Sequence, residues 1–394
     1  MKKVFKVFTI DMISKLFAVI STLLIIRYMG TSDYAEYAII TSFIAIITGV
    51  LINGFNRIYI IEYNRIKYNQ IDILIIQILI ILILGFIASL ISNTKYTSLL
   101  IILLLSTCIF HYVRTLYQQR CLFKTFALID LIRVIIFNIF IFILTKRNTI
   151  LHLNLTILFQ SLALASALFF LAALMKRDKT IKITLDFKNI LRILLEKEQF
   201  VLFLFFGFNA VLLQIDIMSL RFWSNDLMVA SYSSAFKYYS LEMMVLETVN
   251  SIMLPEVNKE KSKITIKKLY DQHNIMTLVF GIGMLLAIIV APIVIPLIDK
   301  GKYPDAVIVF RVLSVSAIIS FAGSPYINYI MKEKEYVFAV INNISSIILA
   351  IIINYVFIKL WGAVGTALAA LIVYGINNMF VRLYAKHLMN KEDT

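Results

Sequence analysis

The chain has 394 residues, of which 61% are hydrophobic and only 15% are charged, and its formal net charge at pH 7 is +15. A soluble domain is about half apolar, so this composition excludes a soluble globular protein and indicates that lipid is the solvent. The positive charge does not indicate nucleic-acid binding, because basic residues of membrane proteins gather on the cytoplasmic side and the sequence contains no nucleic-acid module.

Apolar segments of about twenty residues, each long enough to cross a hydrocarbon core of ~30 Å, recur along the whole chain. The first begins directly after Met1-Lys2-Lys3 and has no small-residue cleavage site, so we interpret it as a retained helix rather than a signal peptide. In chain order, the sequence predicts membrane helices over 5–28, 34–55, 71–92, 97–117, 126–145, 152–175, 200–222, 228–253, 274–298, 305–330, 336–358 and 362–386.

The charges between these segments provide an independent test of the count. Segments on the side of the N-terminus carry 26 lysines and arginines, whereas those on the other side carry eight. Since a missed helix would scramble this alternation, the bias supports twelve helices and predicts that both termini are cytoplasmic. We therefore expect an all-α polytopic membrane protein with a six-helix lobe over 1–175, a basic cytoplasmic linker over 176–199 and a second six-helix lobe over 200–394.

Charged residues inside the predicted helices are the candidate functional groups. Each would cost about 2.5–3.5 kcal/mol at the bilayer centre if nothing solvated it, so most must pair or face a wet cavity. The nine are Asp11, Lys15, Asp130, Arg133, Asp216, Lys237, Glu242, Glu247 and Arg311.

Two helix faces suit the wall of a water-filled cavity. At 100° per residue, one narrow arc of the eighth helix contains Ser233, Lys237, Ser240, Met244, Glu247 and Ser251. The first helix has a similar face, with Asp11, Ser14, Lys15, Ala18 and Thr22.

Each of these charges has a functional and a structural interpretation. In the functional one, Lys15, Lys237, Arg133 and Arg311 attract an anionic head group such as a diphosphate. In the structural one, Asp11 pairs with Lys15 at i,i+4, Asp130 pairs with Arg133 at i,i+3, and Arg311 snorkels at the outer end of its helix.

The acids have alternatives of the same kind. Asp216, Glu242 or Glu247 is a candidate to bind a proton or a sodium ion for coupling, and the alternative is a structural salt bridge or an interfacial carboxylate. No metal spacing, catalytic constellation or phosphate-binding loop ending in Lys-Ser/Thr occurs, so we expect no catalytic residue, no metal and no cofactor beyond an H⁺ or Na⁺ gradient.

Several strings resemble the O-antigen and polysaccharide flippases of the multidrug/oligosaccharidyl-lipid/polysaccharide (MOP) exporter superfamily. The run from Arg27 to Tyr37 resembles that family's Arg-x-Leu-Gly-x-x-x-Tyr-Gly-x-Tyr pattern, with Ala35 in place of its usual glycine. The other strings are Gln119-Arg120 with Phe123 and Ala127; Gln214-Ile215-Asp216 with Tyr232-Ser233-Ser234-Ala235 and Leu254-Pro255; and Leu360 to Ala369.

The resemblance implies two six-helix bundles around a cationic lumen, in the multi-pass inner membrane of a bacterium. It implies a flippase, not an enzyme, that moves an undecaprenyl-diphosphate-linked oligosaccharide, an O-antigen or capsule repeat unit, to the periplasmic leaflet by alternating access. A polysaccharide polymerase and a chain-length regulator are the implied protein partners, beside membrane lipids. Two alternatives stay open: a cation-coupled multidrug exporter of the same superfamily, and a membrane polymerase or ligase, which the short outward loops disfavour.

Overall fold

A computed structural model of the chain describes residues 2–66, 70–91, 96–147, 150–178, 186–259 and 263–391. All regular secondary structure in this part is helical, and the β pairing there is limited to an isolated bridge between Met29 and Leu151. The chain forms two compact units, Met1–Ala210 and Val211–Thr394, which we call unit 1 and unit 2. The lobe boundaries expected at 175 and 199 stay a prediction.

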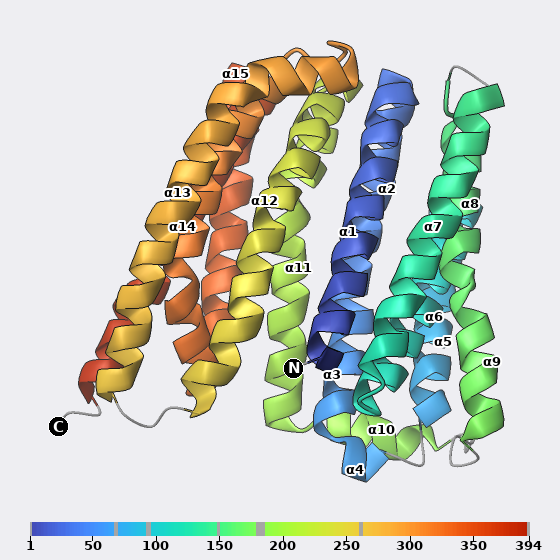
Figure 1. The fold of residues 1–394 in the computed structure, drawn as a ribbon, viewed down its shortest axis with the longest axis vertical. Helices are drawn as coiled ribbons and strands as arrows, with labels where there is room; N and C mark the ends of the chain where they lie inside the picture. Colours follow the sequence, from blue (N-terminus) through green and yellow to red (C-terminus); the bar gives the residue numbers. More distant parts are fainter. Residues whose placement is uncertain are drawn as a thin grey trace. The chain divides into compact units, whose positions relative to one another are not determined.

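The long helices follow one another in chain order with short connections (Figure 1). Unit 1 contains α1 (Lys2–Tyr28), α2 (Thr31–Ile47), the π-helix η1 (Thr48–Asn53), α3 (Gly54–Ile61), α4 (Tyr63–Ile66), α5 (Gln70–Ile91), α6 (Thr97–Gln119), α7 (Phe123–Arg147), α8 (Leu153–Ala165), α9 (Ala167–Arg177), α10 (Phe187–Leu194) and the first half of α11 (Lys197–Trp223). Unit 2 contains the rest of α11, α12 (Asp226–Lys259), α13 (Lys263–Asp299), α14 (Ala306–Lys332) and α15 (Tyr336–Lys391).

Ten helical segments of the described part are long and apolar enough to cross a membrane. One of them, in α15, spans 55 residues. It is bent at Gly362, where φ is 55° and ψ is −129°, so it supplies two spans. The positive φ explains why glycine occupies this position. α12 covers the predicted eighth span, 228–253, and extends beyond it at both ends; Lys237 and Glu242 are the charged residues of that span whose side chains are described. The chain is therefore a multi-pass membrane protein with about ten to twelve apolar helices, while the side of its termini stays a prediction.

The second membrane span is a continuous helix whose middle is a π-helix. α2, η1 and α3 run without a break from Thr31 to Ile61, past the predicted end at 55. A Cβ on Gly49 would lie 2.1 Å from the Cβ of Ala210, and a Cβ on Gly54 would lie 2.5 Å from the Phe203 ring. Two glycines therefore allow α11 to approach η1 and α3 closely. The wider π turn also changes which side chains follow on each face, a feature that is frequent at functional sites.

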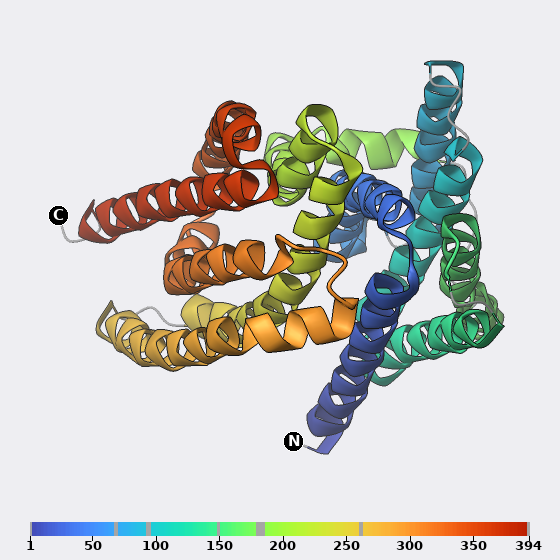
Figure 2. The ribbon, with the colours of Figure 1, turned by 90° about the horizontal axis from the view of Figure 1, so that it is seen from above.

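At one end of unit 1, the short helix α10 lies across its long helices. Figures 1 and 2 show α10 lying across the direction of the long helices of unit 1, at the end where α4 also lies. Ile190 and Ile193 on α10 are buried, at 2% and 1% exposure. The Arg65 guanidinium binds Glu196 through two nitrogens and also Glu62, at 3.2 Å. These contacts hold the segment after α10 against α4.

Candidate functional site

The described part of unit 1 contains a cavity of about 290 Å³ with a basic wall, which we call the basic pocket. Four helical elements supply its lining. The residues are Asn53, Asn56, Arg57 and Ile60 from η1 and α3; His111, Arg114, Thr115 and Gln118 from α6; Phe126 from α7; and Phe206 from α11. Its volume equals that of about ten waters at ~30 Å³ each, which is room for a polar head group.

Two arginines of the basic pocket have no acidic partner among the described residues. The Arg57 side chain is exposed and makes no ion pair there. The Arg114 guanidinium carbon lies 4.2 Å from the ring centroid of Phe126 and 5.5 Å from that of Phe110, and its Nε is buried without a hydrogen-bond partner. A guanidinium that is held by aromatic rings and has an unpaired N–H donor is able to bind a phosphate or a carboxylate.

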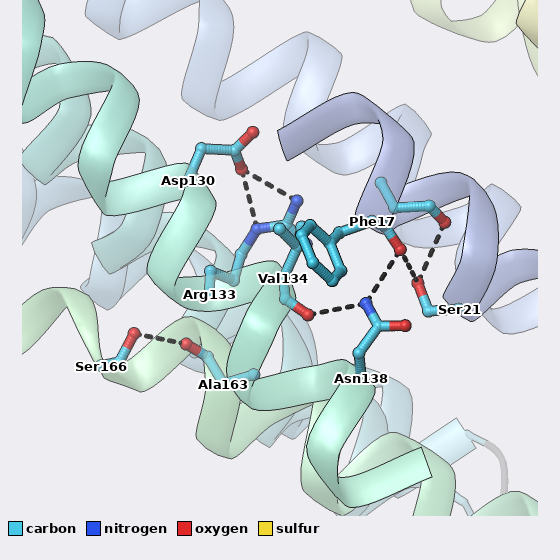
Figure 3. A network of polar contacts seen from close by, with 9 residues as sticks. Phe17, Ser21, Asp130, Arg133, Val134, Asn138, Ala163 and Ser166 are labelled. Atoms are coloured by element: carbon cyan, nitrogen blue, oxygen red, sulfur yellow. Dashed lines mark hydrogen bonds and ion pairs between the residues drawn. The ribbon is translucent and has the colours of Figure 1, made fainter. Parts of the chain in front are cut away.

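The charges predicted on the first and fifth membrane spans flank this pocket as two ion pairs. Lys15 Nζ lies 3.3 Å from an Asp11 oxygen, and Arg133 lies 2.8 Å from Asp130 (Figure 3). Both local pairs that the sequence offered as the structural interpretation therefore form. Arg114 lies within electrostatic range of Asp11, Asp130 and Arg133.

Contacts between α1 and α7 fix these pairs in position. Asn138 on α7 donates from Nδ2 to the carbonyls of Phe17 on α1 and Val134 on α7, both at 2.8 Å (Figure 3). The Arg133 guanidinium also lies 5.1 Å from the Phe110 ring that Arg114 approaches. The group thus contains two carboxylates and four cations, and its net charge is +2 with a neutral histidine.

The remaining predicted cations lie in unit 2 and have different surroundings. Lys237 is half-buried on α12, and its ammonium has no ion-pair partner in the described part of the chain. Arg311 on α14 is exposed and donates from Nε to the Ile288 carbonyl at 3.1 Å, an attachment to α13. Their assignment to substrate contact, like that of Lys15 and Arg133, stays a prediction.

The stripe predicted around Lys237 is described only in part. Ser233 is buried at 1% exposure, whereas Ser240 is half-buried and donates to the Lys237 carbonyl at 2.7 Å. The side chains of Glu247 and Ser251 lie outside the described residues.

Unit 2 buries a carboxylate between three helices. Asp216 on α11 is 6% exposed; it accepts a hydrogen bond from the Tyr232 hydroxyl of α12 at 2.8 Å and another from Asn354 Nδ2 of α15, also at 2.8 Å. Asn354 Oδ1 is buried without a partner. Because carboxylate and amide oxygens are ligands for hard cations, this arrangement can hold Na⁺ or a proton.

A second buried carboxylate lies further along α12. Glu242 is 7% exposed and accepts one hydrogen bond, from the Ser314 hydroxyl of α14 at 2.9 Å. Its Oε2 is buried and has no partner. We call Asp216 and Glu242, with the polar groups that bind them, the buried acidic centre. Among the described residues, no cluster of three or more His, Cys, Asp or Glu side chains could hold a metal ion.

The sequence analysis did not single out Arg57, His111 or Arg114: Arg57 lies just beyond the predicted span 34–55, and His111 and Arg114 lie in the last turns of the predicted span 97–117. A signal was present. On α6, His111, Arg114, Thr115 and Gln118 recur at i, i+3, i+4 and i+7, which is one polar face of an otherwise apolar helix.

No family model and no curated protein matches the chain. Among solved structures, the chain is similar to the lipid II flippase MurJ in an inward closed conformation, with 16% identity, a TM-score of 0.77 and coverage of 96% of this chain and 87% of that one. It is also similar to an inward-facing multidrug resistance MATE family transporter of the MOP superfamily, with 14% identity, a TM-score of 0.70 and coverage of 98% and 99%.

A third similar structure is a MOP superfamily transporter from Pyrococcus furiosus, whose reverse polarity of the binding pocket suggests a different function. It has 14% identity, a TM-score of 0.60 and coverage of 99% of this chain and 94% of that one. At such identities the likeness establishes the fold. The chain therefore has a fold like that of the lipid II flippase and the MATE transporters.

Proposed function

We propose that this protein is a flippase that moves a lipid-linked oligosaccharide with an anionic diphosphate, such as an undecaprenyl-diphosphate-linked repeat unit, across the bacterial inner membrane by alternating access. The observation that carries this proposal is the basic pocket, with its two arginines that lack an acidic partner in the described part of the chain. The fold itself is that of transporters that include a lipid II flippase.

The charge of the pocket favours an anion over a cation. A cationic drug would meet the uncompensated charge of Arg57 and Arg114, and like charges brought together at an interface cost several kcal/mol. A diphosphate gains from the same charges, since guanidinium groups bind phosphate oxygens bidentately. The P. furiosus structure shows that pocket polarity has been connected with function within this fold.

The alternative of a cation-coupled multidrug exporter is favoured by one observation, the buried acidic centre. Under the flippase proposal, Asp216 and Glu242 instead bind the coupling ion, H⁺ or Na⁺, and the oligosaccharide lipid binds in unit 1. The two functions therefore differ in whether unit 1 binds an anionic or a cationic ligand.

Direct binding tests this difference. The purified protein in lipid nanodiscs is titrated with undecaprenyl diphosphate, with the uncharged alcohol of the same chain, and with a cationic dye such as ethidium. We expect tight binding of the diphosphate only. Binding should be abolished in Arg57→Ala/Arg114→Ala and retained in Lys359→Ala, which removes a positive charge from an exposed site in unit 2. Binding of ethidium but not of the diphosphate would favour the drug exporter and overturn the proposal.

Transport is tested separately in proteoliposomes. A fluorescent lipid-linked diphosphate sugar is placed in both leaflets, and a reductant that bleaches the fluorophore is added outside. Without transport, the reductant reaches only the outer leaflet; a protein that moves the lipid exposes the rest. We expect complete and ion-gradient-dependent accessibility with the wild type, and half accessibility with the double arginine variant. Wild-type protein that binds the diphosphate without moving it would refute the flippase and leave a lipid-binding protein.

A further inference from the structure

α10 has one face buried against unit 1 and another that nothing in the described chain covers. The buried face contains Ile190 and Ile193. The second face combines two cations with two leucines, at i, i+3, i+4 and i+7. They are Lys188, Leu191 and Arg192 on α10 and Leu195 directly after its last residue, and the leucines are 48% and 72% exposed. A shallow groove of about 600 Å³ follows this face, with Glu196 at its end. We call it the α10 face.

The charge of the α10 face is positive because its one carboxylate is already bound. Glu196 is held by the Arg65 guanidinium, which keeps the pKa of the Glu196 carboxyl below its usual range. Arg192 lies within electrostatic range of the same carboxylate. Neither Lys188 nor Arg192 makes an ion pair at contact distance with any described residue.

The orientation of α10 fits a membrane surface. It lies across the direction of the long helices of unit 1 (Figures 1 and 2), so when those helices cross the bilayer, α10 lies along the plane of the membrane. It is also anchored at that end, since Asp186, directly before it, donates its backbone N–H to Asp72 of α5 at 3.2 Å. Leucines beside lysine and arginine on one face are typical of interfacial helices, whose apolar side chains enter the acyl boundary while the cations meet head groups.

We propose that the α10 face is a binding surface for anionic phospholipid head groups, with Lys188 and Arg192 contacting the phosphates and Leu191 and Leu195 inserted beside them. The occupant is a bilayer lipid rather than a protein because two cations and two leucines alternate along α10 and the residue that follows it. Each basic side chain near an anionic bilayer contributes about 1 kcal/mol, so the pair predicts an enrichment of anionic lipid of up to about thirty-fold.

Fluorescence quenching by brominated lipids tests the proposal on the full chain. The natural tryptophans, Trp223 and Trp361, are replaced by phenylalanine, and Leu195→Trp places the reporter on the α10 face. The protein is reconstituted in phosphatidylcholine with brominated phosphatidylglycerol or brominated phosphatidylcholine at equal fractions. We expect stronger quenching by the phosphatidylglycerol, and a weaker preference at high salt, because salt screens the head-group charges.

One test variant and two controls accompany the measurement. Lys188→Ala/Arg192→Ala should reduce the preference to near one, whereas Lys124→Ala, an exposed charge near the same end of unit 1, should leave it unchanged. Phe142→Trp, at a 58% exposed position within a membrane span, should be quenched equally by both lipids. This last reporter also shows that each variant is inserted and folded.

Each contrary result overturns the proposal. A tryptophan at 195 that neither lipid quenches would show that another surface or water covers the α10 face. Equal quenching by both lipids, unaffected by Lys188→Ala/Arg192→Ala, would show apolar insertion without recognition of the anionic head group. The outcome does not depend on the transported substrate, because these measurements require no substrate.

Discussion

Replacing Arg114 by alanine should weaken diphosphate binding far more than removing the neighbouring Asp130–Arg133 pair. Arg114→Ala lowers the net charge of the group around the basic pocket from +2 to +1. A unit charge about 5 Å from a phosphate, at an effective dielectric constant of about 20, contributes about 3 kcal/mol. Because Arg114 is half-buried, we expect most of this to be realised, and about 2–3 kcal/mol corresponds to a thirty- to hundred-and-fifty-fold loss of affinity.

The paired deletion Asp130→Ala/Arg133→Ala removes one charge of each sign and leaves the net charge at +2. The two contributions largely cancel at the position of a ligand, so we expect affinity within about threefold of wild type. Arg133→Ala alone should bind more weakly than the double variant, because it leaves the Asp130 carboxylate unpaired beside Arg114.

Calorimetric titration of undecaprenyl diphosphate into nanodiscs that contain each variant provides the measurement. Thermal unfolding of the same samples identifies variants that are merely misfolded. Equal losses in Arg114→Ala and Asp130→Ala/Arg133→Ala would refute the reasoning, because the anion would then be bound by the paired arginine, as the sequence alone suggested.

Three further changes test other parts of the structure. Gly49→Val should destabilise the protein by about 1–3 kcal/mol, since even a Cβ there lies 2.1 Å from α11; Gly281→Ala, with no atom within 4 Å, should not lower the unfolding midpoint. Glu196→Gln should lower the amide protection factors of α10 at neutral pH. Acid should lower the same protection factors in the wild type, because a carboxyl with a lowered pKa stabilises above its usual pKa of about 4.3 and this stabilisation is lost as the pH falls. Tyr232→Phe should cost about 0.6 kcal/mol and change the H⁺ or Na⁺ dependence of transport, because Asp216 loses one donor.

The membrane helices could be predicted from the sequence because lipid imposes a simple rule. An apolar run of about twenty residues bounded by charges has few alternatives to a spanning helix. The last predicted span begins at Gly362, and this is where the structure bends, with a positive φ that other residues rarely adopt. The ends were less predictable: the second span continues through η1 and α3 to Ile61, and no local sequence pattern indicated a π-helix.

The candidate site was only partly predictable, for a different physical reason. Pairs at i,i+3 and i,i+4 are encoded locally, so Asp11 with Lys15 and Asp130 with Arg133 could be read from spacing. The hydrogen bond from Asn354 to Asp216 joins residues that are 138 positions apart, and nothing short of the fold brings them together.

The structure indicates that an intramembrane charge marks a ligand-binding position when no neighbour on its own helix neutralises it. Asp11, Lys15, Asp130 and Arg133 each find a counter-charge within one turn, which removes most of the cost of burying them.

The intramembrane charges that lack such a partner are cations in unit 1, whereas in unit 2 they are of both signs. In unit 1 they are the cations Arg57 and Arg114, and in unit 2 the buried carboxylates Asp216 and Glu242 have hydrogen bonds from neutral groups but no cation within contact distance among the described residues. The predicted cations of unit 2, Lys237 and Arg311, also make no ion pair in the described part of the chain, although Arg311 donates to the Ile288 carbonyl. A charge held in this way is stabilised when a ligand of opposite sign arrives, so the same physical argument that assigns an anion to the basic pocket assigns a proton or a sodium ion to the buried acidic centre.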